Sequence, residues 1–382
     1  MKKLIETIAS VGRLHKSSPH IKDVDIFKPF FKGNDLFDLD AQDASNCTRR
    51  ELICRFLLLN AILDQGPDME GVRQLLADTL NNLYKKEIRI LHTPQSFFNQ
   101  LDTAINNIDK THDLIKDIRE KDWQLKNKTN KHYNLFIDGT TQTLSYAVFR
   151  WGTPLAVPLT LSNINNDNPQ SLIEFLKSFS SSEIMSQEIK KHKKYGLGKA
   201  IGDKAAHLFA KWTIYTYSLL NSTTDSGWGQ FSFEIPFDSN AGRVLWRTGF
   251  FLHFISEDDF IKNKVIQIGS GKHGKNYLRI TNCRGIKITQ NIQDVNKDKY
   301  DRLCIDCLKV IKKSPKNIEL QRVPAVLLYE DKNYTVGELD DGLMYIGTNF
   351  CFNHDHPKCD ECPLKKLCEG VKNKKLISEY TT

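Results

Sequence analysis

The sequence lacks a hydrophobic run long enough to cross a bilayer. Its longest apolar stretch, residues 56–63, is interrupted by Asn60, and a membrane-spanning helix needs roughly 20 apolar residues. The amino end has the basic start of a signal peptide, but Glu6 interrupts the apolar segment that follows and no small-residue cleavage site is present. We therefore expect no membrane helix and a cytoplasmic location, nucleoid-associated in a bacterium or archaeon.

Composition excludes other classes of protein. The 382 residues include 54 Lys and Arg and 46 Asp and Glu, with 40% hydrophobic and 10% aromatic residues, which is unlike a disordered or fibrous chain. At roughly 100–200 residues per domain, this length predicts two or three compact units. The nine cysteines are an odd number and crowd toward the carboxyl end. Their distribution favours a metal site in a reducing compartment over a disulfide framework.

The first part of the chain divides into two segments. Residues 1–44 show no strong hydrophobic period and are interpreted as an extension or lid. Residues 45–104 are predicted to be helical, and Thr48 stands three residues before a glutamate in the spacing of a capping box. Apolar residues at helical spacing predict a second helix over 72–83. A third helix is expected from Thr93, with a proline in its first turn.

The remainder of the chain divides into four segments: 105–185, 186–264, 265–345 and 346–382. The first and third of these are interpreted as insertions. A hairpin could form over 135–161, and helical character returns over 171–220. In the second insertion, alternation of polar and apolar residues predicts strands over 266–288 and 323–345.

Two basic segments are candidate nucleic-acid contacts. Residues 190–211 contain seven lysines and one aspartate, and residues 363–375 contain five lysines and one glutamate. A charge run is often only a solvated face. Two such runs beside candidate chemical motifs favour nucleic-acid binding, because phosphate attraction supplies most sequence-independent affinity.

Four cysteines near the carboxyl end have the spacing Cys-x7-Cys-x2-Cys-x5-Cys: Cys351, Cys359, Cys362 and Cys368. One tight pair flanked by single cysteines is typical of a loop around an iron–sulfur cluster. A zinc ribbon instead brings two tight pairs together. A 4Fe-4S cluster is therefore the first interpretation.

Zinc is the alternative cofactor. Cys304 and Cys307 form a second Cys-x-x-Cys pair that could join the central pair of the loop, and His354 and His356 could also bind zinc. The remaining cysteines are expected to be buried small hydrophobes: Cys47, Cys54 and Cys283.

The cysteine loop, with Pro357 ahead of its central pair and Pro363 and Leu364 after it, resembles the carboxy-terminal iron–sulfur loop of helix-hairpin-helix DNA glycosylases of the endonuclease III and adenine glycosylase type. Its first gap is one residue longer than is usual in that family. The sequence Ile-Gly-Asp-Lys at 201–204 looks like the second half of the family's hairpin, with Ala200 in place of the first glycine.

Two more segments extend the resemblance. Residues 235–249 read Ile-Pro-Phe-Asp-Ser-Asn-Ala-Gly-Arg-Val-Leu-Trp-Arg-Thr-Gly and are similar to the family's catalytic aspartate segment, with Asp238, Arg243 and Arg247 at the family's spacing. Residues 58–65 resemble the family's early helix. The four motifs stand in the family's order, and the resemblance covers about one third of the chain.

The resemblance implies a mainly α fold: a two-lobed helix-hairpin-helix glycosylase core with strand-bearing insertions, a DNA groove between the lobes and a carboxy-terminal iron–sulfur loop. It implies that Asp238 is the catalytic carboxylate, although an aspartate at a helix start is also expected as an N-cap. It also implies that Lys204 is a nucleophile that forms a Schiff base with the sugar. A phosphate-binding or merely solvated lysine is the alternative.

Four residues are carried as DNA-binding candidates: Gln65, Gly202, Lys199 and Arg243. Gln65 would fill the space left by a flipped nucleotide or meet the base, and a plain polar helix end is its alternative. Gly202 would let backbone amides approach a phosphate. Arg243 and Arg247 are expected mainly to anchor helices and the loop of Asp238.

The implied function is a monomeric DNA glycosylase of DNA repair. It would cleave the N-glycosidic bond of a damaged, mismatched or modified base flipped out of double-stranded DNA, with AP lyase activity through the lysine Schiff base. One alternative is a monofunctional N-glycoside hydrolase of a free modified nucleoside or nucleotide. Another is a noncatalytic DNA-binding metal-cluster protein.

Overall fold

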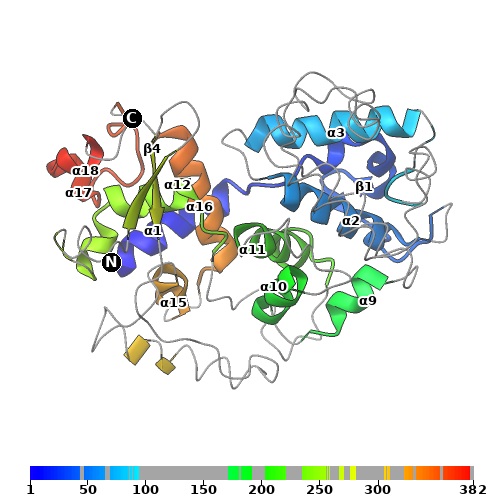
Figure 1. Cartoon of the computed structure of the whole chain (residues 1–382), viewed down its shortest axis with the longest axis horizontal. Helices are drawn as coiled ribbons and strands as arrows, with labels where there is room; N and C mark the ends of the chain where they lie inside the picture. The colour runs from blue at the N-terminus through cyan, green and yellow to red at the C-terminus, as the bar shows by residue number, and fades with distance from the viewer. Residues whose placement is uncertain are drawn as a thin grey trace. The chain divides into compact units, whose positions relative to one another are not determined.

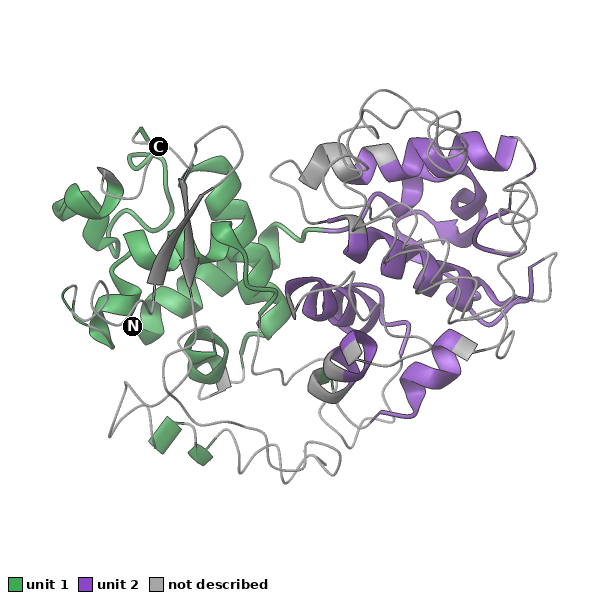
Figure 2. Ribbon diagram, in the orientation of Figure 1, with its two compact units in different colours: residues 1–17, 180–184, 222–382 green, residues 18–179, 185–221 purple. Residues whose placement is uncertain are grey.

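The computed structural model describes residues 1–43, 47–64, 69–85, 87, 89–93, 171–179, 182–191, 203–220, 235–254, 256, 258, 266–270, 276–280, 305–306, 308–309, 322–329, 333–352 and 356–378. Helices dominate this part of the chain, and its sheets are short antiparallel pairs (Figure 1). Among these residues no helix is both long and apolar enough to span a membrane. The chain divides into two compact units, coloured separately in Figure 2: unit 1 comprises 1–17, 180–184 and 222–382, and unit 2 comprises 18–179 and 185–221.

Unit 1 contains both ends of the chain. Its described elements are α1 (Lys2–Leu14), α12 (Ser239–Arg247), the 3-10 helix η5 (Phe250–His253), β3 (Ile266–Ser270), β4 (Asn276–Ile280), α15 (Val323–Tyr329), α16 (Val336–Asn349), α17 (Glu369–Lys372) and α18 (Lys375–Ser378). β3 and β4 pair antiparallel, with Ile266 opposite Ile280. This hairpin confirms the strands expected in the first part of 266–288.

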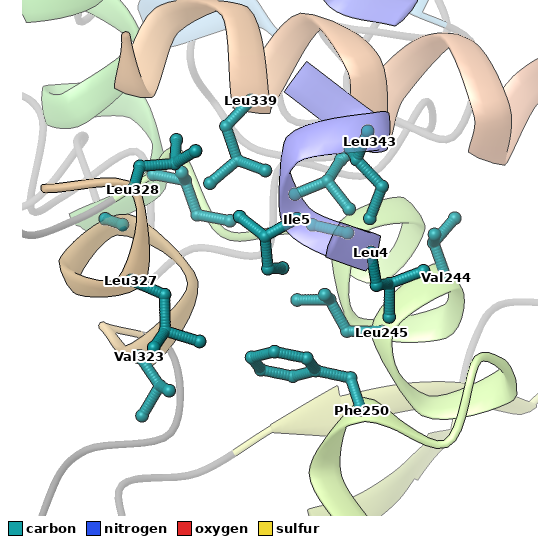
Figure 3. Packing of buried hydrophobic residues seen from close by; sticks show 14 of the residues in the cluster. Leu4, Ile5, Val244, Leu245, Phe250, Val323, Leu327, Leu328, Leu339 and Leu343 are labelled. Atoms are coloured by element: carbon teal, nitrogen blue, oxygen red, sulfur yellow. The ribbon is translucent and has the colours of Figure 1, made fainter. Parts of the chain in front are cut away.

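The first helix belongs to the hydrophobic core of unit 1. Leu4 and Ile5 of α1 pack among apolar side chains of α12, α15 and α16 (Figure 3). Together with Ile8 and Ala9 they recur at helical spacing, and all four are buried. An apolar stripe of this kind stabilises a helix against a core. The expectation that residues 1–44 have no strong period is therefore wrong for α1.

Two glycines allow α1 and α16 to cross in close contact. A Cβ atom added to Gly12 would lie 1.8 Å from the carbonyl oxygen of Glu338, and one added to Gly342 would lie 1.9 Å from the carbonyl oxygen of Ile8. Arg13, the next residue of α1, pairs with Glu338 through Nε and Oε1 at 2.6 Å. Backbone packing and an ion pair thus join the start of the chain to a helix more than 300 residues later.

Residues 323–345 were expected to form strands, and this expectation is wrong because α15 and α16 are helices. Thr335 is the N-cap of α16. Its hydroxyl accepts the amide of Glu338 at 3.1 Å, and the Glu338 carboxylate accepts the amide of Thr335 at 2.7 Å. This capping box fixes a helix start, and burial of one helical face against α1 then outweighs the strand preference of the β-branched and aromatic residues.

Unit 2 is built on helices that surround α2. Its described elements are η1 (Ile21–Asp23), η2 (Asp25–Phe30), β1 (Phe31–Lys32), β2 (Asp35–Leu36), α2 (Arg49–Leu63), α3 (Met69–Lys85), α9 (Ser171–Lys177), α11 (Asp203–Lys211) and the π-helix η4 (Trp212–Thr216), while α10 (Ser182–Lys191) passes from unit 1 to unit 2. α2 contacts α3, α9, α11 and η4. The helices expected after Thr48, over 72–83 and in the described parts of 171–220 are confirmed. The helix expected after Thr93 and the hairpin at 135–161 lie outside the described residues.

A buried ion pair on α2 contacts both the segment that ends at residue 93 and the start of α9 at residue 171. Thr48 accepts the amide of Glu51 at 3.2 Å, as a capping box requires, but the Glu51 carboxylate serves other partners. It accepts Nε of Arg55 at 2.8 Å and the first amides of α9 at 3.3 and 2.9 Å. Arg55 donates through Nη1 to the carbonyl oxygen of Leu91 at 2.8 Å. α9 is therefore capped by a side chain of α2.

Candidate functional site

Asp238 is the N-cap of α12 in unit 1. It is half-buried and has an extended backbone. Its Oδ1 atom accepts the amides of Asn240 at 2.8 Å and Ala241 at 2.9 Å. An aspartate in this position satisfies amides that lack an intrahelical partner and meets the positive end of the helix dipole. Because both bonds use Oδ1, the cap does not engage Oδ2.

Arg243, one turn further along α12, connects the aspartate segment to the cysteine loop. It is 6% exposed and donates from Nε to the carbonyl oxygen of Cys351 at 2.6 Å and from Nη2 to the carbonyl oxygen of Gly347 at 3.0 Å. Nη2 also donates to Oδ1 of Asn240 at 2.5 Å. Burial lowers the pKa of the Arg243 guanidinium. These contacts are those of an anchor between α12, the end of α16 and the loop.

Arg247 makes a second connection from α12 to the same loop. Its Nη1 donates to the carbonyl oxygen of Phe352 at 2.6 Å and lies 3.7 Å from Sγ of Cys351. Its own carbonyl oxygen accepts Sγ of Cys368 at 3.3 Å. Two of the four cysteines of the motif are therefore held directly by the last turn of α12.

All four cysteines of the motif line one cavity in unit 1. Cys351, Cys359, Cys362 and Cys368 share its wall with Arg247 and with apolar side chains of α12, α16, the loop and α18: Val244, Ile346, Leu364 and Ile377. The cavity has about 390 Å³ of empty space, including its opening to solvent. The spacing read from the sequence thus corresponds to one place in the fold.

Four cysteine thiols line this cavity, and four thiolates are the ligand set that an iron–sulfur cluster uses. Burial raises the pKa of the Cys362 and Cys368 thiols to about 11 and that of Cys359 above its usual value, and a metal must displace these protons because the thiolate is the ligand. An apolar wall with Arg247 beside a sulfur suits an anionic thiolate cluster. Within the described residues, no three His, Cys, Asp or Glu side chains are grouped to hold one metal ion.

Most residues that are specific to the zinc alternative lie where the structure gives no description. Cys304, Cys307 and His354 lie outside the described residues, and His356 is exposed and does not line the cavity. Cys47 and Cys54 in unit 2 are buried and free of disulfides, as expected of small hydrophobes, whereas Cys283 lies outside the described residues.

Lys204 belongs to α11 in unit 2 and contacts the end of α2. Its Nζ donates to the carbonyl oxygen of Asp64 at 2.7 Å and lies 3.5 Å from Oδ1 of the same residue. The side chain is 22% exposed, whereas the Asp64 side chain is fully buried. The second proposed catalytic residue is thus tethered at its amine, and Asp238 belongs to the other unit.

Asp64 and its partner Arg73 are residues that sequence reasoning missed. Arg73 on α3 donates from Nη2 to Oδ2 of Asp64 at 2.9 Å, and both side chains are almost fully buried. The available signal was a charge on an apolar helical face, since Arg73 stands between Val72 and Leu75. Such a residue needs a buried counter-charge. The sequence did not identify which acid supplies it.

Three DNA-binding candidates, Gln65, Lys199 and Gly202, lie outside the described residues. Arg243, the fourth, is the buried anchor described above. The chain matches no family model, no curated protein and no solved structure.

Proposed function

We propose that this chain is a DNA glycosylase of the helix-hairpin-helix type that removes a damaged, mismatched or modified base from double-stranded DNA. Its lysine would also cut the resulting abasic strand. The observation that carries the proposal is the double role of α12, whose first residue is capped by Asp238 and whose Arg243 and Arg247 hold the four-cysteine loop. The aspartate segment and the cysteine loop are two of the four segments that carry the sequence resemblance.

The proposed role of Asp238 is electrostatic. When the N-glycosidic bond breaks, its electron pair leaves with the base and positive charge develops on the sugar. A carboxylate facing the sugar stabilises that charge or orients the attacking group. The N-cap leaves Oδ2 outside its two hydrogen bonds, so one oxygen can serve the substrate while the other holds the helix.

The proposed role of Lys204 is covalent. The Nζ lone pair attacks C1′ of the open-chain sugar. One amine proton and one solvent proton then convert the aldehyde oxygen to water. The water departs, and a protonated Schiff base remains. Elimination then breaks the bond between the sugar and its 3′ phosphate. Phosphates would be gathered first by the lysines of 190–211 and of the carboxyl-terminal tail.

The proposed cofactor is a 4Fe-4S cluster bound by Cys351, Cys359, Cys362 and Cys368. When bound, the cluster would supply a rigid core for the loop and no redox step in the glycosidic chemistry. The chain's own part is to hold the loop through Arg243 and Arg247, so that Lys358 and Lys365 project from a fixed backbone. Iron and sulfide analysis of the purified protein tests the cluster, and one zinc with no iron contradicts it.

Replacement of Asp238 by Asn tests the glycosylase. The Asn side chain keeps an oxygen for the helix cap but removes the negative charge, so we expect base release to fall by at least about a hundredfold while DNA affinity is retained. Substrates should be drawn from oligonucleotides with different lesions and hypermodified bases. Asp360→Asn, an exposed acid on the cysteine loop, is the matched control. Full activity of Asp238→Asn contradicts the assignment.

Borohydride trapping on abasic-site DNA tests the lyase. The native chain should give a covalent adduct that Lys204→Ala does not give. Lys194→Ala removes a lysine from the same basic segment and controls for phosphate binding, so it should trap normally at saturating protein. Activity on free nucleosides with no duplex binding would instead favour the small-molecule hydrolase.

A further inference from the structure

The amine of Lys204 is held by the carboxyl-terminal end of α2. Asp64 is the C-cap of that helix, and its carbonyl oxygen accepts Nζ of Lys204 at 2.7 Å. The last carbonyl groups of a helix lack intrahelical donors and carry the negative end of the helix dipole. The Lys204 amine donates a hydrogen bond to this carbonyl oxygen, and the bond holds Nζ at one defined point at the helix end.

The end of α2 is itself fixed by a second charge. Arg73 donates to Oδ2 of Asp64 from Nη2 at 2.9 Å and from Nε at 3.3 Å. A guanidinium that makes two bonds to a carboxylate fixes direction as well as distance. The Asp64 side chain is 0% exposed and that of Arg73 is 3% exposed, so solvent does not compete for this pair.

The contacts close a ring within unit 2. The Arg73 guanidinium lies 5.4 Å from the ring centroid of Trp212, and Trp212 begins η4 directly after α11, the helix of Lys204. Lys204 returns to Asp64, which returns to Arg73. Asp64 and Arg73 are therefore each held from two sides, Asp64 by Lys204 and Arg73, and Arg73 by Asp64 and Trp212. Movement of the Lys204 amine requires breaking contacts to a buried ion pair.

We infer that Asp64, locked by Arg73, is the positioning residue of the Lys204 amine. This inference rests on the proposed function, because it assigns the amine its reaction with C1′ of the sugar. Nucleophilic attack requires the reacting atoms to be held about 3–3.5 Å apart along a defined direction. Asp64 itself does not touch substrate, since its side chain is fully buried. Asp64 acts by fixing the position of Nζ and, with it, the conformation of the Lys204 side chain on α11.

The test compares single-turnover borohydride trapping in variants of the full chain. Asp64→Asn removes the charge but leaves Arg73 buried without its anion, which is strongly destabilising. The main variant is therefore Asp64→Asn combined with Arg73→Met, which removes both charges and keeps similar side-chain volumes. Asp40→Asn is the matched control. It removes the acid of another arginine–aspartate pair of unit 2, with Arg50, and the Asp40 side chain is 82% exposed.

We expect the maximal trapping rate of the double variant to fall at least tenfold, with the half-saturating protein concentration unchanged within twofold and the control at the native rate. A partly unfolded population would lower the amount of adduct rather than the single-turnover rate constant, so a purely structural role is distinguishable. A native trapping rate in the double variant overturns the inference. So does an equal loss of DNA binding and trapping.

The proposed function fails separately. If the native chain releases base but forms no adduct with abasic DNA, Lys204 is not the nucleophile and the inference falls with it, while the glycosylase proposal stands. If the native chain neither releases base nor forms an adduct, both proposals are overturned. If it forms an adduct that Asp64 and Arg73 do not influence, the positioning role alone is refuted.

Discussion

Arg243 donates from Nε to the carbonyl oxygen of Cys351 at 2.6 Å, across 108 residues of sequence. The same guanidinium binds the side chain of Asn240, whose amide donates to Asp238. The start of α12 and the first cysteine of the loop are therefore connected through one buried side chain. A change in the cysteine loop should therefore affect the position of the Asp238 carboxylate. A change at Arg243 should affect both the loop and the carboxylate.

Replacing Arg243 by Gln should uncouple the loop from α12. The carbonyl oxygens of Cys351 and Gly347 would lose a charged donor, and loss of such hydrogen bonds costs about 1.5–3 kcal/mol each. We expect the free energy of unfolding to fall by at least about 2 kcal/mol and, because the proposed cluster depends on this loop, the iron content per chain to fall by more than half. Arg13→Gln removes a half-exposed arginine of unit 1 and should leave the iron content unchanged. Native iron content in Arg243→Gln would contradict the anchoring role.

Replacing Gly342 by Ala should destabilise unit 1. The new Cβ would meet the backbone of Ile8 at 1.9 Å, so α1 and α16 would have to separate, and an overpacked contact costs about 1–3 kcal/mol. Thermal unfolding measures the loss. Thr348→Ala, an exposed position on the same helix, should change stability by less than about 0.5 kcal/mol. Equal melting temperatures for the two variants would argue against the close crossing.

Acid should weaken unit 1 through Glu338. Burial alone would raise the pKa of this carboxyl, but hydrogen bonds from Arg13 and Thr335 hold it below the usual value of 4.5. A carboxyl with a lowered pKa in the folded state contributes stability that is present above pH 4.5 and is lost as the pH falls through the lowered pKa. Glu338→Gln should remove this part of the pH dependence. Urea unfolding at several pH values between 3 and 7 would show it, and parallel curves for both proteins would exclude it.

Replacing Asn60 by Leu should stabilise unit 2. Asn60 is 1% exposed, and in the described part of the chain its amide nitrogen and oxygen have no hydrogen-bond partner. An unsatisfied buried polar group costs about 1–3 kcal/mol, and Leu has a similar shape. We expect a gain of about 1 kcal/mol in chemical unfolding. A loss of stability would mean that an internal water binds the amide.

Local signals predicted several elements correctly. Thr48 and Asp238 cap the helices that follow them. Each side-chain oxygen accepts a backbone amide three residues later, so the contact depends only on residues that are close in the sequence. The strands expected over 323–345 were wrong, because they rested on alternation of polar and apolar residues, whereas the local capping box at Thr335 and Glu338 indicates a helix start. The helix at the amino end was also missed, although its apolar spacing is regular.

The sequence by itself determined the spacing of the four cysteines, the N-cap at Asp238 and the starts of the helices, because these depend on residues that are neighbours along the chain. Only the tertiary structure decided that Arg243 binds the Cys351 carbonyl and that Lys204 binds Asp64, which lies 140 residues away. A charged side chain has many possible partners in a sequence of this composition. Packing selects one of them, because a buried charge is stable only where the fold brings a complementary group within hydrogen-bonding distance.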